Sequence, residues 1–428
     1  MNKTLGIYIH IPFCASKCGY CDFYSLAGCD KLMPKYHNAL LQHIRESAHQ
    51  LREYYTDTVY FGGGTPSYYG ARRICDIFNA LKRSGLVYKS GEVTVEANPD
   101  SLRYHDLMAL RDAGVNRISL GAQSANDDLL KLIGRRHTWQ QVKKAVKNAR
   151  DAGFENVSLD LIYGLPSQSP EDWADTLTRA LELQPEHLSC YGLKLEEGTP
   201  MYFYKDSEIL PDDDAQADMY LYTCETLERY GYEQYEISNF ARPGFASKHN
   251  LKYWLLRDYM GFGPGAASSV NGIRYSYVKD LKQYISGIQG GGTIVDEYEK
   301  IGEMDRAAEY LMLGMRTVRG ISPKEYHNIY RSDFMPLQEL LEEYERKGWA
   351  VAEHGRWHFT PSGFLLSNLL IRLMLDKQGE YKLSGNPWVD SMDMFLDKTE
   401  LPAGEEVFYH EKSAESVPAP AAAQTSIF

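Results

Sequence analysis

Six short runs of β-branched and aromatic residues recur through the first half of the chain, separated by stretches with apolar residues at helical spacing. One stretch, SLRYHDLMALRDAG, predicts a helix with Ser101 as its N-cap and Gly114 as its stop, and TWQQVKKAVKNARDAG predicts another that ends at Gly153. Strand and helix alternating in this way predict a parallel sheet, most simply a partial (β/α)6 barrel over roughly residues 5–205. The six runs are LGIYIHIP, TVYFGGG, EVTVEANP, RISLGAQS, NVSLDLIYGLP and HLSCYGLKL.

Each predicted strand ends in a polar, glycine or cysteine feature. In barrels of this kind the C-terminal ends of the strands form the active face, so we expect these features to converge on one site. In chain order they are a cysteine loop, the stretch GGGTPS, Glu96 with Asn98, Gln123, Asp160, and Tyr191 with Gly192.

The stretch HIPFCASKCGYCDFYS carries three closely spaced cysteines, Cys14, Cys18 and Cys21, directly after the first predicted strand. A zinc site would need a fourth Cys or His at matching spacing, and a thioredoxin-like C-x-x-C pair would leave Cys14 unexplained. Chance clustering of structural cysteines stays open as an alternative. A four-iron cluster fits best, because three thiolates would leave one iron open to a small chelating ligand.

Composition narrows the partners and the compartment. The net charge of -12 argues against broad contact with phosphates, so we expect no nucleic-acid partner. Seven cysteines in 428 residues are too few for a disulfide framework, which suits a reducing cytoplasm and a metal or cofactor site. No apolar run is long enough to cross a bilayer, and the start of the chain lacks the features of a signal peptide.

The C-x-x-x-C-x-x-C loop after the first strand of a partial barrel resembles that of the radical S-adenosylmethionine (SAM) superfamily, in which SAM chelates the open iron. GGGTPS resembles the superfamily's segment whose backbone contacts the SAM amino group, although alone it could equally be a flexible turn. By resemblance to oxygen-independent coproporphyrinogen oxidases, Arg135 would pair with the SAM carboxylate, a role that suits a planar guanidinium. The SAM contacts implied in this way are Tyr8, Tyr20, Gly63, Gly64, Thr65, Glu96, Gln123, Arg135 and Asp160.

Two departures from the decarboxylating oxidases favour the branch of HemW-type heme chaperones. The cysteine loop continues as CDFYS, with Phe23 where the oxidases have a further Cys, and only seven residues precede Tyr8. The stretch HNLKYW resembles the chaperones' heme-binding motif. It implies His249 as an axial ligand of the heme iron, with Tyr253 and Trp254 stacking on the porphyrin. From chemistry alone, a lone histidine beside aromatic residues is more often a packed or capped histidine than an iron ligand.

The rest of the chain suggests further units. We expect residues 1–235 to form the barrel, and 236–300 to be a linker that carries the heme motif and the Gly-rich stretch YMGFGPGAASSV. The resemblance implies that this stretch closes over the barrel mouth, while a turn between elements stays open. Residues 301–378, with helices followed by the hairpin-like VAEHGRWHFTPSGF, predict a winged-helix-like domain. Its acidic helix argues for a structural or partner-docking lid rather than a DNA reader. The extension 379–428 departs from the family pattern, and its Ala-, Pro- and Ser-rich end predicts disorder.

Two functions of different class follow from the resemblance. One is a heme chaperone that carries a [4Fe-4S] cluster and SAM, binds heme and hands it to an acceptor hemoprotein, one of the respiratory chain. The cluster would then serve dimerisation or control of transfer, and peripheral contact with a membrane is compatible with such an acceptor. The other is an oxygen-independent coproporphyrinogen III oxidase that uses radical SAM chemistry to make protoporphyrinogen. We favour the chaperone and assign no catalytic residue, while residual SAM cleavage stays open.

Overall fold

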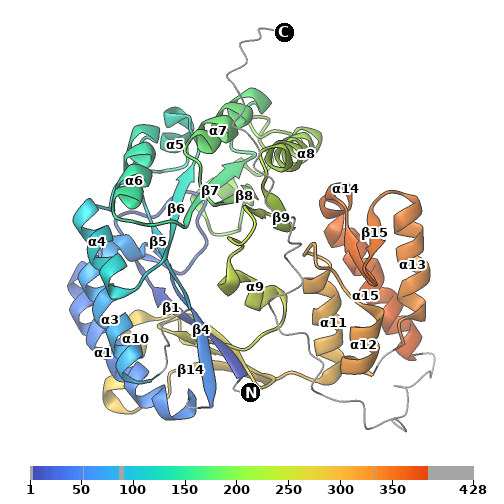
Figure 1. The fold of residues 1–428 in the computed structure, drawn as a ribbon. Helices are drawn as coiled ribbons and strands as arrows, with labels where there is room; N and C mark the ends of the chain where they lie inside the picture. Colours follow the sequence, from blue (N-terminus) through green and yellow to red (C-terminus); the bar gives the residue numbers. More distant parts are fainter. Residues whose placement is uncertain (1–2, 52, 86–90, 332, 384–428) are drawn as a thin grey trace.

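A twelve-stranded sheet organises the first three hundred residues (Figure 1). The structure, a computed structural model, describes residues 3–51, 53–85, 91–331 and 333–383. Six neighbouring strands of this sheet run parallel in chain order, which confirms the six predicted runs. They are β1 (Lys3–Ile11), β4 (Tyr54–Gly63), β5 (Glu92–Ala97), β6 (Arg117–Gln123), β7 (Val157–Tyr163) and β8 (His187–Gly192).

Helices cover the outer face of the curved sheet, and the apolar side chains of the strands pack beneath them (Figure 1). In β6, for example, Ile118, Leu120 and Ala122 belong to this core, whereas Arg117 and Ser119 face the inside of the curve. The helices are α1 (Met33–Ser47), α2 (Pro66–Tyr69), α3 (Ala71–Arg83), α4 (Tyr104–Ala113), α5 (Asp127–Leu132), α6 (Trp139–Asp151), α7 (Pro170–Glu182) and α8 (Asp213–Arg229).

The predicted ends of two helices can be compared with the structure. Gly114 ends α4 with φ +112°, and Gly153 follows α6 with φ +85°, both as predicted. The predicted N-cap at Ser101 is wrong, because α4 begins at Tyr104 and Arg103 occupies the N-cap. Ser101 instead lies in a turn after β5. Its backbone N–H and its hydroxyl both donate hydrogen bonds to the Asn98 carbonyl.

The expected linker at 236–300 needs correction, because this segment extends the sheet at both edges. β11 (Tyr259–Phe262) pairs with β1 in parallel, and three antiparallel strands follow it. The stretch YMGFGPGAASSV therefore forms β11 and β12 rather than a loop over the barrel mouth. The other elements are β9 (Glu233–Glu236) and β10 (Asn239–Ala241) beside β8, α9 (Lys248–Trp254), β12 (Ala267–Val270), β13 (Ile273–Tyr277), α10 (Leu281–Gly290) and β14 (Val295–Lys300).

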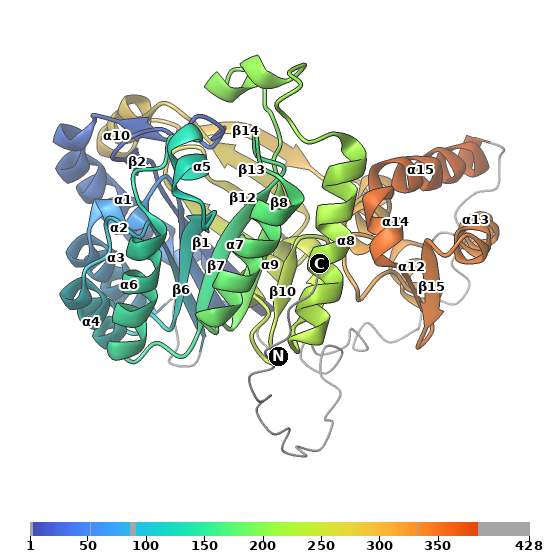
Figure 2. The same ribbon diagram turned by 90° about the horizontal axis from the view of Figure 1, so that it is seen from above.

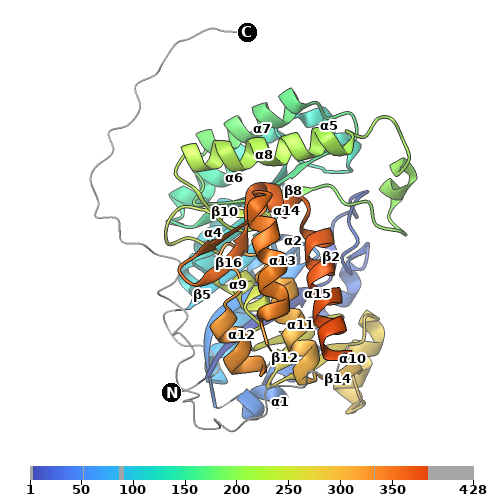
Figure 3. The same cartoon turned by 90° about the vertical axis from the view of Figure 1, so that its right-hand side faces the viewer.

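Five helices and a hairpin stack beside the open side of the sheet, where α11 contacts α9 (Figures 1 and 3). The hairpin predicted from VAEHGRWHFTPSGF is confirmed, and the group agrees with a winged-helix-like arrangement. The stretch NPWVDSMDMF and the tail beyond it lie outside the described residues. The elements are α11 (Glu303–Gly314), α12 (Pro323–Tyr330), α13 (Met335–Arg346), β15 (Ala350–Glu353), β16 (Arg356–Phe359), α14 (Pro361–Leu365) and α15 (Ser367–Leu383).

Two features complete the frame of the site. The connection from β8 to α8 projects beyond the rest of the sheet (Figure 2) and carries a short helix, Pro200–Tyr204. This arm is tied to the cysteine loop, because the Met201 backbone N–H donates to the Gly19 carbonyl (2.9 Å). Within the described ranges, no helix combines the length and the apolarity needed to span a bilayer.

Candidate functional site

The cysteine loop is held at the C-terminal edge of the sheet by a short parallel ribbon, β2 (Phe13–Cys14) with β3 (Leu26–Ala27). Its three cysteines line one cavity of about 410 Å³. The cavity is also lined by the features predicted at the ends of the six strands, which the structure thus brings to one place.

The cysteine side chains suit a cluster rather than a single ion. The Sγ of Cys14 lies 3.3 Å from the Thr65 hydroxyl, and Arg135 donates to the Sγ of Cys18 (3.7 Å). Burial raises the pKa of the Cys14 and Cys21 thiols. Among the described residues, no three His, Cys, Asp or Glu side chains converge on one metal ion. A four-iron cluster does not require such convergence, because each thiolate binds a different iron.

The glycine stretch after β4 packs against this loop. The N–H groups of Gly64 and Thr65 donate to the carbonyls of Ile11 and Phe13, each at 2.8 Å. A Cβ on Gly64 would lie 2.8 Å from both of those oxygens, closer than packing allows. Gly63 has φ +108°, a backbone conformation that other residues rarely adopt. The glycines therefore serve close backbone approach rather than flexibility.

The predicted SAM contacts gather in the same cavity with one exception. Tyr8 lines a second cavity instead, where its ring stacks on Tyr60 and its hydroxyl lies 3.0 Å from His10 Nδ1. Gln123 has φ +65° at a bulge between β6 and β7, a strained backbone of the kind found at binding sites. The residues that line the first cavity are Tyr20, Gly63, Gly64, Thr65, Glu96, Gln123, Arg135 and Asp160.

Arg135 differs from the expected bidentate clamp. Its Nη2 already donates to the Gly121 carbonyl (2.6 Å) and to the Asn98 side chain (2.8 Å). Its Nε is buried without a hydrogen-bond partner among the described residues. A buried donor left unpaired is costly, so this nitrogen is available to a ligand.

Two carboxylates face the same cavity. Glu96 accepts hydrogen bonds from the Tyr60 hydroxyl (2.8 Å) and the Gly63 N–H (3.1 Å). Burial raises the pKa of Glu96 to about 7, although the Tyr60 hydrogen bond opposes the shift. Burial also raises the pKa of Asp160, which accepts from the Ser119 hydroxyl (3.1 Å).

Sequence reasoning missed Arg117, which also lines this cavity. Its side chain is fully buried, and its Nε and Nη1 have no hydrogen-bond partner in the described part of the chain. Alternation along RISLGAQS would have revealed it, because Arg117 shares the inward face of β6 with Ser119, Gly121 and Gln123.

A second cavity of about 860 Å³ lies between α9, the inner face of the sheet and α11. It contains all three predicted heme residues, His249, Tyr253 and Trp254, while Met312 and Leu313 of α11 line its other side. The two cavities adjoin, since both are lined by Phe23, Tyr60, Gly63, Glu96, Tyr191 and Asn250.

His249 is buried, and both of its ring nitrogens are engaged. Nδ1 lies 2.8 Å from the Thr58 hydroxyl and Nε2 lies 2.8 Å from the Tyr253 hydroxyl. Its ring stacks on Tyr60 with the centroids 5.1 Å apart. Burial, aided by the charge of Lys252, lowers the pKa of His249 to about 3, so the ring is neutral. Ligation of an iron by Nε2 would require Tyr253 to move.

Profiles of two known families match the chain: the Radical SAM superfamily over residues 8–180, and the HemN C-terminal domain over residues 303–366. A solved structure described as coproporphyrinogen III oxidase (HemN) from Escherichia coli, a radical SAM enzyme, has a TM-score of 0.76. It covers 87% of this chain and 90% of its own at 23% identity, a likeness that shows the fold. Fold and cysteine site together define a radical SAM protein, a class whose cofactors are a [4Fe-4S] cluster and SAM.

Two curated relatives are similar to nearly the whole chain. Heme chaperone HemW of Lactococcus lactis subsp. lactis is 35% identical over 381 residues, which cover 88% of this chain and 99% of the relative. Heme chaperone HemW of Bacillus subtilis is 37% identical over 368 residues, which cover 84% and 96%. The chain belongs to the HemW family within the radical SAM superfamily.

Proposed function

We propose that this chain is a heme chaperone, which binds heme in the second cavity and delivers it to acceptor hemoproteins. The observation that carries the proposal is the second cavity itself. It is large, aromatic on the side of α9 and apolar on the side of α11, and it shares a wall with the cysteine cavity. Such a concave, mostly apolar space suits a flat aromatic ligand. The curated relatives, named as heme chaperones, support the same function.

In this proposal the first cavity holds the resident cofactors. Cys14, Cys18 and Cys21 bind the cluster, and the predicted SAM contacts that line the cavity hold SAM. The Arg135 Nε offers a hydrogen bond to an anionic group, and Gly63 and Gly64 let the strand end pack closely against His10 and the cysteine loop that form the wall of the cavity. When bound, the cluster and SAM supply one-electron chemistry.

The heme motif would work through a change of partners at His249. Tyr253 turns away from Nε2 when heme enters, which frees a neutral imidazole for the iron. Thr58 stays on Nδ1 and fixes the ring orientation, as a second hydrogen bond does for ligating histidines in general. Tyr253 and Trp254 then stack on the porphyrin, since both line the cavity.

The proposal also covers the acceptor, the compartment and the oligomeric state of the chaperone. The acceptor is a hemoprotein of the respiratory chain, and the chaperone acts in the cytoplasm as a homodimer with peripheral contact to a membrane. Residues 301–378 form a second unit beside the barrel, whose sheet includes the strands of 236–300. The acceptor, the dimer and the membrane contact rest on the resemblance to the family.

Titration of the anaerobically reconstituted protein with heme tests the proposal. We expect stoichiometric binding, and no porphyrin product when the same protein receives coproporphyrinogen III, SAM and a reductant. Porphyrin formation without heme binding would overturn the proposal in favour of the oxidase. The variant His249→Ala should change the absorption spectrum of the bound heme, and an unchanged spectrum would remove His249 as the ligand.

A further inference from the structure

Arg257 stands beside the second cavity, and no described carboxylate forms a hydrogen bond or ion pair with it. It is half-buried and lines the cavity just beyond α9. Within the described residues its guanidinium takes part in no hydrogen bond or ion pair, in contrast to Arg274 of the same cavity, which is paired with Glu309 at 2.7 Å. The charges of Glu325 and Asp258 act on Arg257 without a direct contact, so this partly desolvated cation lacks the hydrogen-bonded anion that such groups normally have.

The backbone fixes the position of Arg257. Leu256 follows α9 with φ +52°, and the Arg257 N–H donates back to the Lys252 carbonyl (2.9 Å). This is the hydrogen-bond pattern of a helix end that usually has glycine where Leu256 stands. Lys252 is itself buried and bound to Asp57 (2.8 Å), which anchors the helix to β4. Arg257 therefore sits on a fixed turn rather than on a loose loop.

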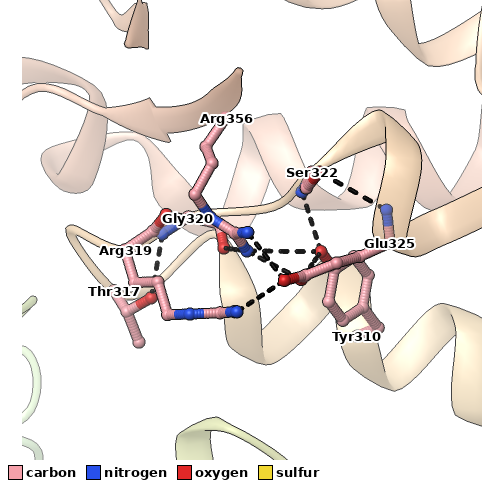
Figure 4. Close-up of polar contacts among 7 residues, drawn as sticks. All are labelled: Tyr310, Thr317, Arg319, Gly320, Ser322, Glu325 and Arg356. Carbon is pink, nitrogen blue, oxygen red and sulfur yellow. Dashed lines mark hydrogen bonds and ion pairs between the residues drawn. The ribbon is translucent and has the colours of Figure 1, made fainter. Parts of the chain in front are cut away.

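A second positive group lies behind Arg257 in the C-terminal domain. Figure 4 shows Glu325 held by two arginines: Arg319 donates at 2.6 Å, and Arg356 donates at 2.8 and 2.9 Å. Two cations on one carboxylate leave this cluster with a net positive charge. Burial and the charge of Arg319 lower the pKa of Arg257, and they outweigh the opposing charges of Glu325 and Asp258. An anion bound at Arg257 would relieve the repulsion between Arg257 and Arg319.

We propose that Arg257 binds a propionate carboxylate of the heme, a role that rests on the proposed function. Heme is a flat apolar ring with two carboxylates on one edge. The cavity offers both an apolar wall for the ring and a cation for a carboxylate. Trp254, Tyr259, Met312 and Leu313 line it with apolar and aromatic side chains, and Arg257 contributes the guanidinium. A guanidinium pairs well with a carboxylate, because it donates two parallel hydrogen bonds.

Comparison of heme with heme dimethyl ester isolates this contact, because the ester lacks free carboxylates and keeps the ring and the iron. Both ligands are titrated into the reconstituted wild-type protein and into Arg257→Met, Arg257→Lys and Arg372→Met. Arg372 is a matched control, since its side chain is 80% exposed on α15. Retained iron and sulfide content shows that each variant is folded.

We expect the wild-type protein and Arg372→Met to bind heme about tenfold more tightly than the ester, the worth of one charge-assisted hydrogen-bonded pair. Arg257→Met should bind both ligands with the affinity of the ester, and Arg257→Lys should keep part of the preference. If wild-type protein binds both ligands equally, or if Arg257→Met keeps the preference, the role of Arg257 is wrong and the heme chaperone stands. If the wild-type protein binds neither ligand, the proposed function itself fails.

Discussion

Replacing Glu325 by glutamine should loosen the C-terminal domain, because among the described residues Glu325 is the carboxylate that pairs with both Arg319 and Arg356 (Figure 4). The Tyr310 hydroxyl also donates to this carboxylate (2.8 Å). A glutamine has nearly the same shape and keeps one acceptor oxygen, but it carries no charge. Two half-buried arginines would then face each other without a counter-ion.

The magnitude follows from the pKa of Glu325. Burial alone would raise this pKa, but the hydrogen bonds from Arg356 and the charge of Arg319 outweigh burial and lower it from 4.5 to about 2. A tenfold change in proton affinity is worth about 1.4 kcal/mol, so the ionised carboxylate stabilises the domain by about 3 kcal/mol near neutral pH. Removal of one partner from a buried ion pair typically costs about as much.

Hydrogen exchange of peptides from α12 and β16, followed by mass spectrometry, measures this loss where it occurs. A cost of about 3 kcal/mol corresponds to about hundredfold faster exchange through local opening. Glu343→Gln on α13 is the control, because its pair with Lys347 is exposed to solvent and should not affect exchange measurably. Less than a threefold change in Glu325→Gln would refute the view that this carboxylate holds the domain together.

Three further predictions concern charge, cluster and backbone. Because the pKa of Glu325 is lowered on folding, its contribution is complete above about pH 5 and is lost as the pH falls towards 2, so the difference in exchange between wild-type protein and Glu325→Gln should shrink over that range. Cys18→Ala should lower the iron and sulfide content of reconstituted protein, whereas Cys75→Ala should not, because Cys75 lies outside the cavity. If the two variants held equal amounts of iron and sulfide, Cys18 would not be a ligand of the cluster. Gly64→Ala should weaken SAM binding at least tenfold in equilibrium dialysis, since its Cβ would displace the cysteine loop. Gly290→Ala is the control that should leave SAM binding unchanged, because a Cβ there meets no atom within 4 Å. Unchanged binding in Gly64→Ala would contradict the need for close approach.

The parallel strands could be predicted from the sequence because each is a local apolar run. The cysteine loop could be predicted because the spacing of its three cysteines by itself indicates a cluster site. The strands of 236–300 could not, because their pairing is not local. β11 lies against β1, about 250 residues earlier in the chain, and its own residues YMGF are followed by glycines that indicate a loop. β14 consists of exposed, mostly charged residues, which carry no apolar alternation.

The hydrogen bonds of the site could not be predicted either, because they also join residues that are far apart in the sequence. The motif HNLKYW identified His249, but it could not reveal that Thr58, on a distant strand, holds Nδ1. Likewise Arg135 could be assigned to the cavity, while its hydrogen bonds to Asn98 and Gly121 depend on the curvature of the sheet. Sequence spacing predicts which residues meet, and the folded structure decides which of their atoms remain available to a ligand.

Tyr60 gives the adjacency of the two cavities a physical basis. Its side chain lines both cavities, its hydroxyl donates to Glu96 on the side of the cluster, and its ring stacks on His249 on the side of the heme motif. Because Tyr60 contacts both Glu96 and His249, the side chains of the two cavities pack on one shared residue. The sequence elements that carry the two motifs are more than 200 residues apart, at Cys21 and His249, and this contact joins them in one structure.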